Sequence, residues 1–235
     1  MTAALATQTT DATLARRLAG VLVSVATGLL ILGGVVLLLI SPLYIHPALD
    51  DAGSAAYLRA GGLAVDAAGA QGLSDRTVQE LFLGPGTFAF PAPGTPGPFY
   101  DAAEASHLRD ARTVLYAFLL VVAAGVVALA AALVAARREA WLWRAISRGA
   151  AILAIALGVI GVFAAVAFDQ AFTLFHEVFF PGGNWSFDPR TERLVQLYPI
   201  PFWERTSTVL VVAAVVVGAI VWWLARRRAR DLEAA

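Results

Sequence analysis

The segment LAGVLVSVATGLLILGGVVLLLI, residues 18–40, decides the class of fold. Its 23 residues carry no charge, follow Arg16-Arg17 and end at Ser41-Pro42. A helix of this length crosses a hydrocarbon layer about 30 Å thick. The segment is also longer than the apolar part of a secretory signal peptide, which has roughly 7–15 residues, so we predict a retained transmembrane helix.

Three further stretches, residues 114–136, 150–168 and 209–224, are apolar on all faces and have Arg at one end. Of the 235 residues, 59% are apolar and 14% charged, whereas soluble domains are about 45–50% apolar and about 25% charged. The sequence therefore predicts an all-α membrane protein, a four-transmembrane-helix bundle with an extracytoplasmic cap of short helices and loops.

Charge predicts the orientation of this bundle. The two tails and the short connection 137–149 contain ten Arg and four acidic residues, a net charge of +6, while the two long connections contain seven Arg and thirteen acidic residues, a net charge of −6. Basic residues are retained on the cytoplasmic side of a membrane. Both termini are therefore expected in the cytoplasm, and both long connections on the extracytoplasmic face.

These patterns divide the chain into nine segments. We expect a disordered cytoplasmic tail (1–13), transmembrane helix 1 (14–43), an extracytoplasmic cap loop (44–101), a helix extending into transmembrane helix 2 (102–136), a cytoplasmic loop (137–149), transmembrane helix 3 with an outward extension (150–180), an extracytoplasmic cap segment (181–206), transmembrane helix 4 (207–225) and a cytoplasmic tail (226–235). Within the cap we expect short helices over 54–60, 75–83 and 188–198.

Composition also excludes several classes of function. The chain has no Cys, so it has no disulfide framework, Cys-ligated metal or thiol nucleophile. Its 17 basic residues are balanced by 17 acidic residues, which does not favour a nucleic-acid partner. A transporter is disfavoured because no Asp, Glu, Lys, Arg or His lies within the four apolar stretches.

Two histidines are predicted at similar heights beyond the apolar stretches. The spacing Asp101-x-x-Glu104 is a capping box, so a helix is expected to start near residue 102 and to carry His107 about 10 Å beyond Val114. No Gly or Pro interrupts residues 162–180, so the third helix should carry His176 about 12 Å beyond residue 168.

Two convergent imidazoles can act as a general base and a general acid, because each titrates near neutral pH. Carboxylates at helical spacing, Glu104 and Asp110 around His107 and Asp169 before His176, could orient the rings. The alternative is that these side chains only solvate helix ends. No His-Glu-x-x-His or His-x-His spacing exists, so no metal site is expected, and His46 is interpreted as an interfacial residue.

Aromatic residues crowd the second long connection. They are Phe172, Phe175, Phe179, Phe180, Trp185, Phe187, Tyr198, Phe202 and Trp203. An interfacial aromatic belt would explain some of them. A pocket that holds acyl chains at the level of the lipid headgroups is the other interpretation.

Two segments carry a resemblance to a known family. The first is Glu104-Ala-Ser-His107-Leu-Arg-Asp110-Ala-Arg112, and the second runs from Phe175-His176-Glu177-Val-Phe-Phe180 through Gly183-Asn184-Trp185-Ser-Phe187-Asp188-Pro189 and Leu194-Val-Gln-Leu197-Tyr198-Pro199 to Phe202-Trp203. Together with four spans in this order, they resemble the lipoprotein intramolecular transacylase (Lit) family over nearly the whole chain.

The resemblance implies four transmembrane helices under an extracellular cap, in a bacterial plasma membrane. It implies movement of the sn-2 acyl chain of a diacylglyceryl-cysteine lipoprotein to the α-amino group of the same cysteine. The two catalytic histidines of the family match His107 and His176. No cofactor and no metal are expected, and the partners implied are a diacylated lipoprotein substrate and membrane lipids.

Further residues of the matching segments are candidates for supporting roles. Candidates for orienting the imidazoles or binding substrate are Asp110, Glu177, Arg109, Arg112, Asn184, Trp185 and Asp188, and candidates for a pocket wall are Phe175, Phe179, Phe180, Tyr198 and Trp203. The first cap loop is longer and richer in Gly and Pro than the family pattern, which leaves the acyl acceptor open. The alternative function is a non-enzymatic membrane protein whose extracytoplasmic cap binds a lipid or protein partner.

Overall fold

The computed structural model describes the backbone of residues 2–235 and the side chains of residues 14–235. Among these residues no strand forms. The helices are α1 (Thr2–Leu39), α2 (Pro42–Ala52), α3 (Ser54–Ala60), α4 (Ala67–Phe82), α5 (Ala102–Ala136), α6 (Ala140–Val166), α7 (Phe168–Phe179), α8 (Arg193–Leu197) and α9 (Ile200–Ala234). The expectation of a disordered tail over residues 1–13 falls on residues whose side chains lie outside the described ones.

Four of these helices are long and apolar enough to cross a membrane: α1 from Leu14 onward, α5, α6 and α9. Their lipid-facing residues stay exposed in the isolated chain, since only 11–39% of the most apolar window of each helix is buried. A helix satisfies its own backbone hydrogen bonds, which is why it can remain in hydrocarbon with so few protein contacts. The predicted all-α membrane class with four spans is confirmed.

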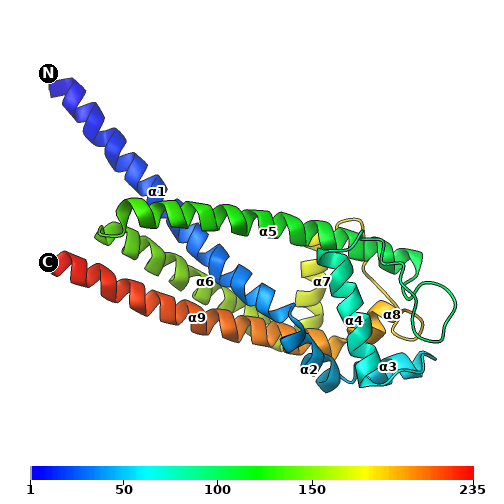
Figure 1. Cartoon of the computed structure of the whole chain (residues 1–235). Coiled ribbons are helices and arrows are strands. Elements are labelled where there is room, and N and C mark those ends of the chain that lie inside the picture. The colour runs from blue at the N-terminus through cyan, green and yellow to red at the C-terminus, as the bar shows by residue number, and fades with distance from the viewer. Residues whose placement is uncertain (1) are drawn as a thin grey trace. The chain divides into compact units, whose positions relative to one another are not determined.

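The chain forms two compact units. The first consists of the residues up to Val35, Leu119–Val159 and Val212–Ala235, and the second of Val36–Phe118 and Ile160–Val211. The first unit therefore contains helical segments only, joined by the connection between α5 and α6. The second contains α2, α3, α4, α7 and α8 together with the adjoining ends of the long helices (Figure 1).

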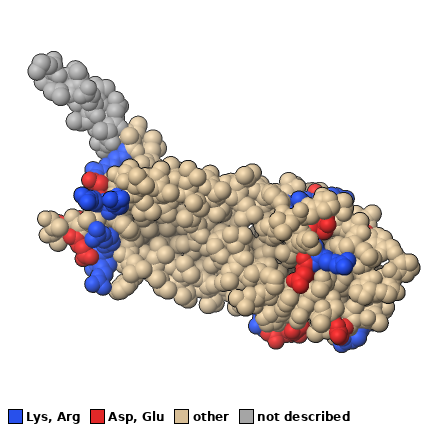
Figure 2. Space-filling model, viewed as in Figure 1, with Lys and Arg blue, Asp and Glu red and all other residues tan. Residues whose placement is uncertain are grey.

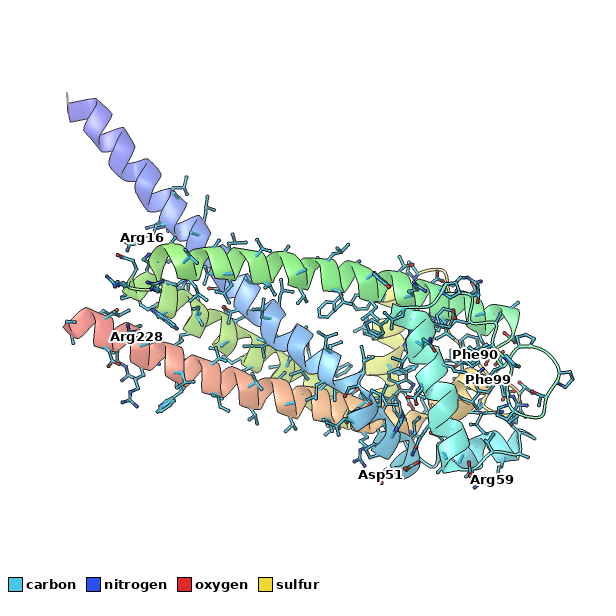
Figure 3. All side chains as sticks on the ribbon, viewed as in Figure 1. Arg16, Asp51, Arg59, Phe90, Phe99 and Arg228 are labelled. Atoms are coloured by element: carbon cyan, nitrogen blue, oxygen red, sulfur yellow. The ribbon has the colours of Figure 1, made fainter. Side chains whose placement is uncertain are left out.

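The first unit gathers its basic residues at one end, as Figure 2 shows, while the rest of its visible surface is uncharged. Arg16 and Arg228, labelled in Figure 3, both belong to this end. Arg16 donates to Glu139 at 3.0 Å, and its guanidinium lies 5.8 Å from the ring of Trp141. This distribution agrees with the charge bias seen in the sequence, in which Arg marks the ends of the apolar segments.

Small residues let α1 and α6 approach each other closely inside the first unit. The Ser24 hydroxyl donates to the carbonyl oxygens of Gly20, at 2.9 Å, and of Ala145, at 2.8 Å. A Cβ atom built on Gly149 would lie 2.1 Å from the carbonyl oxygen of Ser24. Close backbone approach at small residues is the usual way in which membrane helices gain packing contacts.

The second unit has its own apolar core, built around α2, α3, α4, α8 and the start of α5. Its fully buried members include Leu49, Leu58, Phe88, Tyr100 and Leu197. The Pro- and Gly-rich stretch before α5 closes over this core through stacked rings: Phe90 and Phe99 have centroids 5.9 Å apart, and Figure 3 shows them side by side. The core gives the outer segments a fixed frame without any strand.

Several elements differ from the sequence expectations. The third helix does not run unbroken to residue 180: Ala167 has φ −142° and ψ 61°, which ends α6 and starts α7 in a new direction. Nothing in the local sequence requires this break. The fourth helix extends far beyond the expected 207–225, since no Gly or Pro follows Pro201 until Gly218 and none follows thereafter.

The cap helices also differ in their limits. The expected helix over 54–60 is confirmed, whereas α4 begins at Ala67 instead of near residue 75, because the Asp66 side chain caps it by accepting from the Gly69 amide at 2.8 Å. The segment after Asp188 forms turns, and only Arg193–Leu197 is helical. Helix α2, with Pro42 in its first turn, was not expected.

The contact between Gly149 and Ser24 is testable. Gly149→Ala should lower stability by about 1–3 kcal/mol, because the added methyl group forces α1 and α6 apart. Gly158→Ala on the same helix is the matched control, since nothing lies within 4 Å of its Cβ position. Thermal unfolding of both purified variants in detergent measures the difference, and equal midpoints would contradict the close contact.

Candidate active site

His107 lies on the second turn of α5, and the predicted capping box holds the first turn. The Glu104 amide donates to Asp101 Oδ1 at 2.8 Å, and the Asp101 amide donates to Glu104 Oε2 at 2.7 Å. The second oxygen of Glu104, Oε1, accepts from the Leu194 amide at 2.6 Å. Glu104 is only 1% exposed, so it fixes the start of α5 against α8 and thereby the position of His107.

His176 lies on α7, which is not one of the four membrane-length helices. Its ring centroid is 6.0 Å from that of His107, and the two ring planes differ by 28°. The imidazoles are 9% and 8% exposed, respectively. Two helices far apart in the sequence thus place two nearly parallel imidazoles beside each other, within reach of a common substrate group.

Aromatic rings surround both imidazoles. Around His176 the centroids of Phe172, Phe175, Trp185 and Phe180 lie at 4.1, 5.3, 5.1 and 5.5 Å. Around His107 the centroids of Phe180 and Phe187 lie at 4.7 and 5.6 Å. Phe180 contacts both imidazoles and is itself 7% exposed, so it separates the pair from water on the side that it covers.

The hydrogen bond of His176 identifies its tautomer. Nδ1 lies 2.7 Å from the carbonyl oxygen of Phe172, one helical turn earlier. A carbonyl oxygen can only accept, so Nδ1 carries the hydrogen, and in the neutral ring the lone pair is on Nε2. Burial lowers the pKa of His176 from its usual value, and the bond to the Phe172 carbonyl partly opposes this shift. The neutral ring, with a free basic nitrogen, is therefore favoured.

The ring of His107 has an unsatisfied nitrogen. Its Nδ1 is buried and has no hydrogen-bond partner among the described residues. An unpaired buried polar atom is unfavourable by about 1–3 kcal/mol, and such atoms in native proteins call for an explanation. Nδ1 of His107 is thus available for a further hydrogen bond, beside a second imidazole.

Two of the candidate orienting residues pair with each other next to this ring. Asn184 Nδ2 donates to Asp110 Oδ2 at 2.6 Å. Asp110 is on α5, one turn after His107, whereas Asn184 belongs to the turn that follows α7. The bond therefore holds the segment that carries Trp185 and Phe187 against the helix that carries His107.

Three other candidates make no hydrogen bond to either imidazole among the described residues. Arg109 and Glu177 are exposed. Arg112 donates to the carbonyl oxygens of Glu80, at 2.6 Å, and Gly84, at 2.9 Å, and so caps the C-terminal end of α4.

Asp188 is likewise engaged away from the histidines. Its carboxylate accepts from the Arg190 side chain at 2.7 Å, and the hydrogen bonds of Arg190 lower the pKa of Asp188 to about 2. Asp188 and Arg190 thus form a local turn, a use of this carboxylate that differs from the predicted contact with the imidazoles or substrate.

The pocket aromatics divide into two groups. Phe175, Phe179 and Phe180 belong to the aromatic cluster at the histidines, with the rings of Phe175 and Phe179 4.8 Å apart. Tyr198 instead turns into the core of the second unit, where its hydroxyl lies 2.9 Å from the Ser74 hydroxyl. Burial raises the pKa of Tyr198 to about 12, although this hydrogen bond opposes the shift, so the phenol stays neutral. Trp203 connects the groups, with its centroid 6.2 Å from Tyr198 and 6.5 Å from Phe172.

The third histidine is part of the frame of the cap. His46 Nε2 lies 2.8 Å from Asp75 Oδ1 and so joins α2 to α4. Two hollows in the described chain, of about 360 and 390 Å³, are lined by none of the histidines. Among the described residues, no group of three His, Asp or Glu side chains comes together in a way that could hold a metal ion.

Three residues at the site were not among the predicted site residues. Glu104 was predicted only as a helix cap and an orienting neighbour, and its bond to the Leu194 amide could not be inferred from local spacing. Phe172 and Phe187 were part of the aromatic cluster in the sequence but were not assigned to the histidines. Phe172 lies four residues before His176, and this i, i+4 spacing is the signal that could have identified it.

Comparison with known proteins identifies the family. The model of the family described as lipoprotein intramolecular transacylase Lit matches residues 85–203. This range contains both histidines, the pair Asp110 and Asn184, and all the aromatic rings around the imidazoles. A search of curated proteins finds no match.

Solved structures share the fold. The membrane integral lipoprotein intramolecular transacylase Lit from Bacillus cereus superposes with a TM-score of 0.74 at 17% identity, covering 94% of this chain and 98% of that chain. Variants of that protein in which a histidine is replaced by alanine or by arginine have TM-scores of 0.74 and 0.71, each at 14% identity. They cover 97% and 95% of this chain and 100% and 96% of those chains.

Identities this low show the fold alone, whereas the family model spans more than half of the chain. The four membrane-length helices and the likeness to a membrane integral protein agree with that match. The chain is thus a multi-pass bacterial membrane protein that belongs to the lipoprotein intramolecular transacylase (Lit) family.

Proposed function

We propose that this chain transfers the sn-2 acyl chain of a diacylglyceryl-cysteine lipoprotein to the α-amino group of the same cysteine, by general acid and base catalysis at His107 and His176. The observation that carries the proposal is the pair of buried imidazoles 6.0 Å apart within the segment that matches the family. If the protein were a non-enzymatic one whose cap binds a partner, we would expect the two histidines far apart. The 6.0 Å between their ring centroids does not support that alternative.

The reaction moves one acyl group and one proton. The neutral amine attacks the ester carbonyl carbon, and a C–N bond forms while the carbonyl oxygen becomes an oxyanion. A base takes a proton from the nitrogen, the bond between the carbonyl carbon and the glyceryl oxygen breaks, and that oxygen receives a proton. The products are an amide and a free hydroxyl, so no covalent acyl-enzyme is needed.

We assign the base to Nε2 of His176. Its Nδ1 hydrogen is held by the Phe172 carbonyl, and burial favours the neutral ring. After it accepts the proton of the amine, the same nitrogen can deliver that proton to the departing glyceryl oxygen.

The partner ring supplies a second polar contact. In the tautomer with hydrogen on Nδ1, His107 would donate from its unpaired nitrogen to the carbonyl oxygen of the ester. A donor aimed at the developing oxyanion acts most strongly in a site shielded from water. The unpaired Nδ1 of His107 supports this role.

Proximity accounts for a large share of the rate in this scheme. Amine and ester belong to one molecule, and well-oriented intramolecular groups can gain on the order of 7–11 kcal/mol over separate reactants. The protein must then fold the lipid so that the two groups meet. The rings around both imidazoles also keep out water that would hydrolyse the ester.

The remaining site residues are assigned by their contacts. Asp110 and Asn184 hold the turn that carries Trp185 against His107, and we assign them to positioning. Arg109 and Glu177 are exposed and free to meet the substrate headgroup. The excess of Arg in the two tails and in the connection 137–149 supports our proposal that both termini are cytoplasmic and that the site is on the extracytoplasmic face.

His107→Gln and His176→Gln should each reduce acyl migration on the order of 10²- to 10⁴-fold, since each removes an acid–base group. His46→Gln is the matched control, because His46 pairs with Asp75 in the cap frame. Mass spectrometry of the N-terminal peptide of a coexpressed lipoprotein distinguishes the O-acyl and N-acyl forms. Migration that persists in both site variants would eliminate this proposal.

The pH dependence follows from the lowered pKa of His176. A base with a depressed pKa stays neutral as the pH falls past about 6.5, so the acid limb due to this ring should lie below that value. The substrate amine, with a pKa of about 7.7–8.0, gives a separate limb at higher pH.

The variant Phe172→Ala tests whether burial by this ring lowers the pKa of His176. It removes the ring that lies 4.1 Å from His176 but keeps the carbonyl that binds Nδ1. Greater exposure should raise the pKa of His176 toward its usual value and move the acid limb upward. NMR titration of the His176 ring in micelles checks the assignment, and a pKa at or above about 6.5 in the unaltered protein would refute it.

A further inference from the structure

A second feature of the chain lies away from the histidines, in the first unit. A hollow of about 390 Å³ opens between α6 and α9. We call it the arginine hollow; its polar and aromatic lining consists of Arg144, Ser147 and Arg148 from α6 and Trp222, Arg226, Arg230 and Glu233 from α9. Figure 2 shows basic residues gathered at this end of the first unit.

The arginine hollow has an excess of positive charge. Four Arg and one Glu line it, which leaves a net charge of +3. The one carboxylate, that of Glu233, already accepts from Arg144. Within the described part of the chain, no acidic side chain pairs with Arg148, Arg226 or Arg230. Unneutralised guanidinium groups that face one hollow attract anions to it.

The shape of these side chains favours phosphate. A guanidinium group offers two parallel N–H donors that match the oxygen atoms of a phosphate. The Arg226 guanidinium lies 5.4 Å from the ring of Trp222, which restricts its motion at the rim. Ser147 is 8% exposed and adds a hydroxyl to the lining of the hollow.

The position along α9 distinguishes a lipid from a free anion as the ligand. The apolar stretch of this helix ends at Leu224, and Arg226 follows two residues later. Trp222 is the kind of side chain that lies at the boundary between hydrocarbon and headgroups. A phospholipid whose tails lie along the apolar part of α9 would have its phosphate at the level of the arginine hollow.

We propose that the arginine hollow binds the phosphate of an anionic phospholipid. Basic hollows between membrane helices are suited to such headgroups, since each Arg near the surface contributes to the attraction. A bound lipid would bridge Arg148 of α6 and Arg226 of α9 and so stabilise the pairing of the two helices. This site is independent of the acyl transfer reaction.

Native mass spectrometry of the full chain in neutral detergent can test the proposal with three probes offered separately. They are dioleoylphosphatidylglycerol, dioleoylphosphatidylcholine and inorganic phosphate. We expect phosphatidylglycerol to bind about tenfold more tightly than phosphatidylcholine, because the zwitterionic headgroup offsets its own phosphate charge. Equal retention of the two lipids would overturn the preference for an anionic headgroup. Phosphate alone binding as tightly as phosphatidylglycerol would overturn the lipid as its source.

The double variant Arg148→Gln with Arg226→Gln should weaken phosphatidylglycerol binding by on the order of tenfold. Arg137→Gln with Arg138→Gln is the matched control, since it removes the same charge from the connection between α5 and α6, outside the arginine hollow. The control should bind within twofold of the unaltered chain. Equal losses in both double variants would overturn the site in favour of diffuse attraction.

Lipid-free unfolding midpoints exclude a general loss of structure. Without lipid, the double variant Arg148→Gln with Arg226→Gln should have the same thermal unfolding midpoint as the control. Should the double variant fail to fold, Arg148→Gln alone should still weaken binding by about threefold. Unchanged binding in that single variant would likewise overturn the proposal.

Discussion

The desolvation of two neighbouring imidazoles is the condition on which the chemistry of this protein depends. Each ring is about nine-tenths buried, and their centroids are 6.0 Å apart. Removal from water disfavours the charged form of an imidazole, so the pair is held as neutral rings ready to accept and donate protons. The same exclusion of water protects an ester from hydrolysis. The arrangement is stable because Phe180 contacts both rings and so replaces the lost water with packing.

A few long-range contacts in the second unit maintain this arrangement. Glu104 closes the first turn of α5 and accepts from Leu194, so one carboxylate sets both the start of the helix and its docking to α8. Asp110 and Asn184 then bring the turn after α7 against α5. The imidazole of His107 lies between these two contacts along the helix. Its position is therefore set from both sides, by groups that do not themselves react.

Much of this could be predicted from the sequence, wherever the physical cause is local. Residues 18–40 and their three counterparts identify the spans because a bilayer requires long apolar helices. Asp101 and Glu104 predict the start of α5 because a capping box is a short-range hydrogen-bond pattern. The helical rise also predicts how far His107 lies beyond Val114 on α5, whereas it does not give the height of His176, because α7 starts in a new direction after Ala167.

The remainder depends on contacts between distant segments. No Gly or Pro accounts for the break at Ala167. Arg112 caps α4 through the carbonyl oxygens of Gly84 and Glu80, which lie 28 and 32 positions earlier in the sequence. Tyr198 was assigned to the pocket by its neighbours in the sequence, but its hydroxyl meets Ser74 in the core, 124 positions away.

The hydrogen bond between His176 Nδ1 and the carbonyl oxygen of Phe172 depends on very little of the surrounding sequence. The acceptor belongs to the main chain of residue 172, on the same helix. Any amino acid at that position offers the same oxygen, and no other segment has to supply it. The geometry of α7 therefore determines which ring nitrogen of His176 carries the hydrogen. Loops of other lengths and other side chains could surround this ring during evolution without reversing that choice.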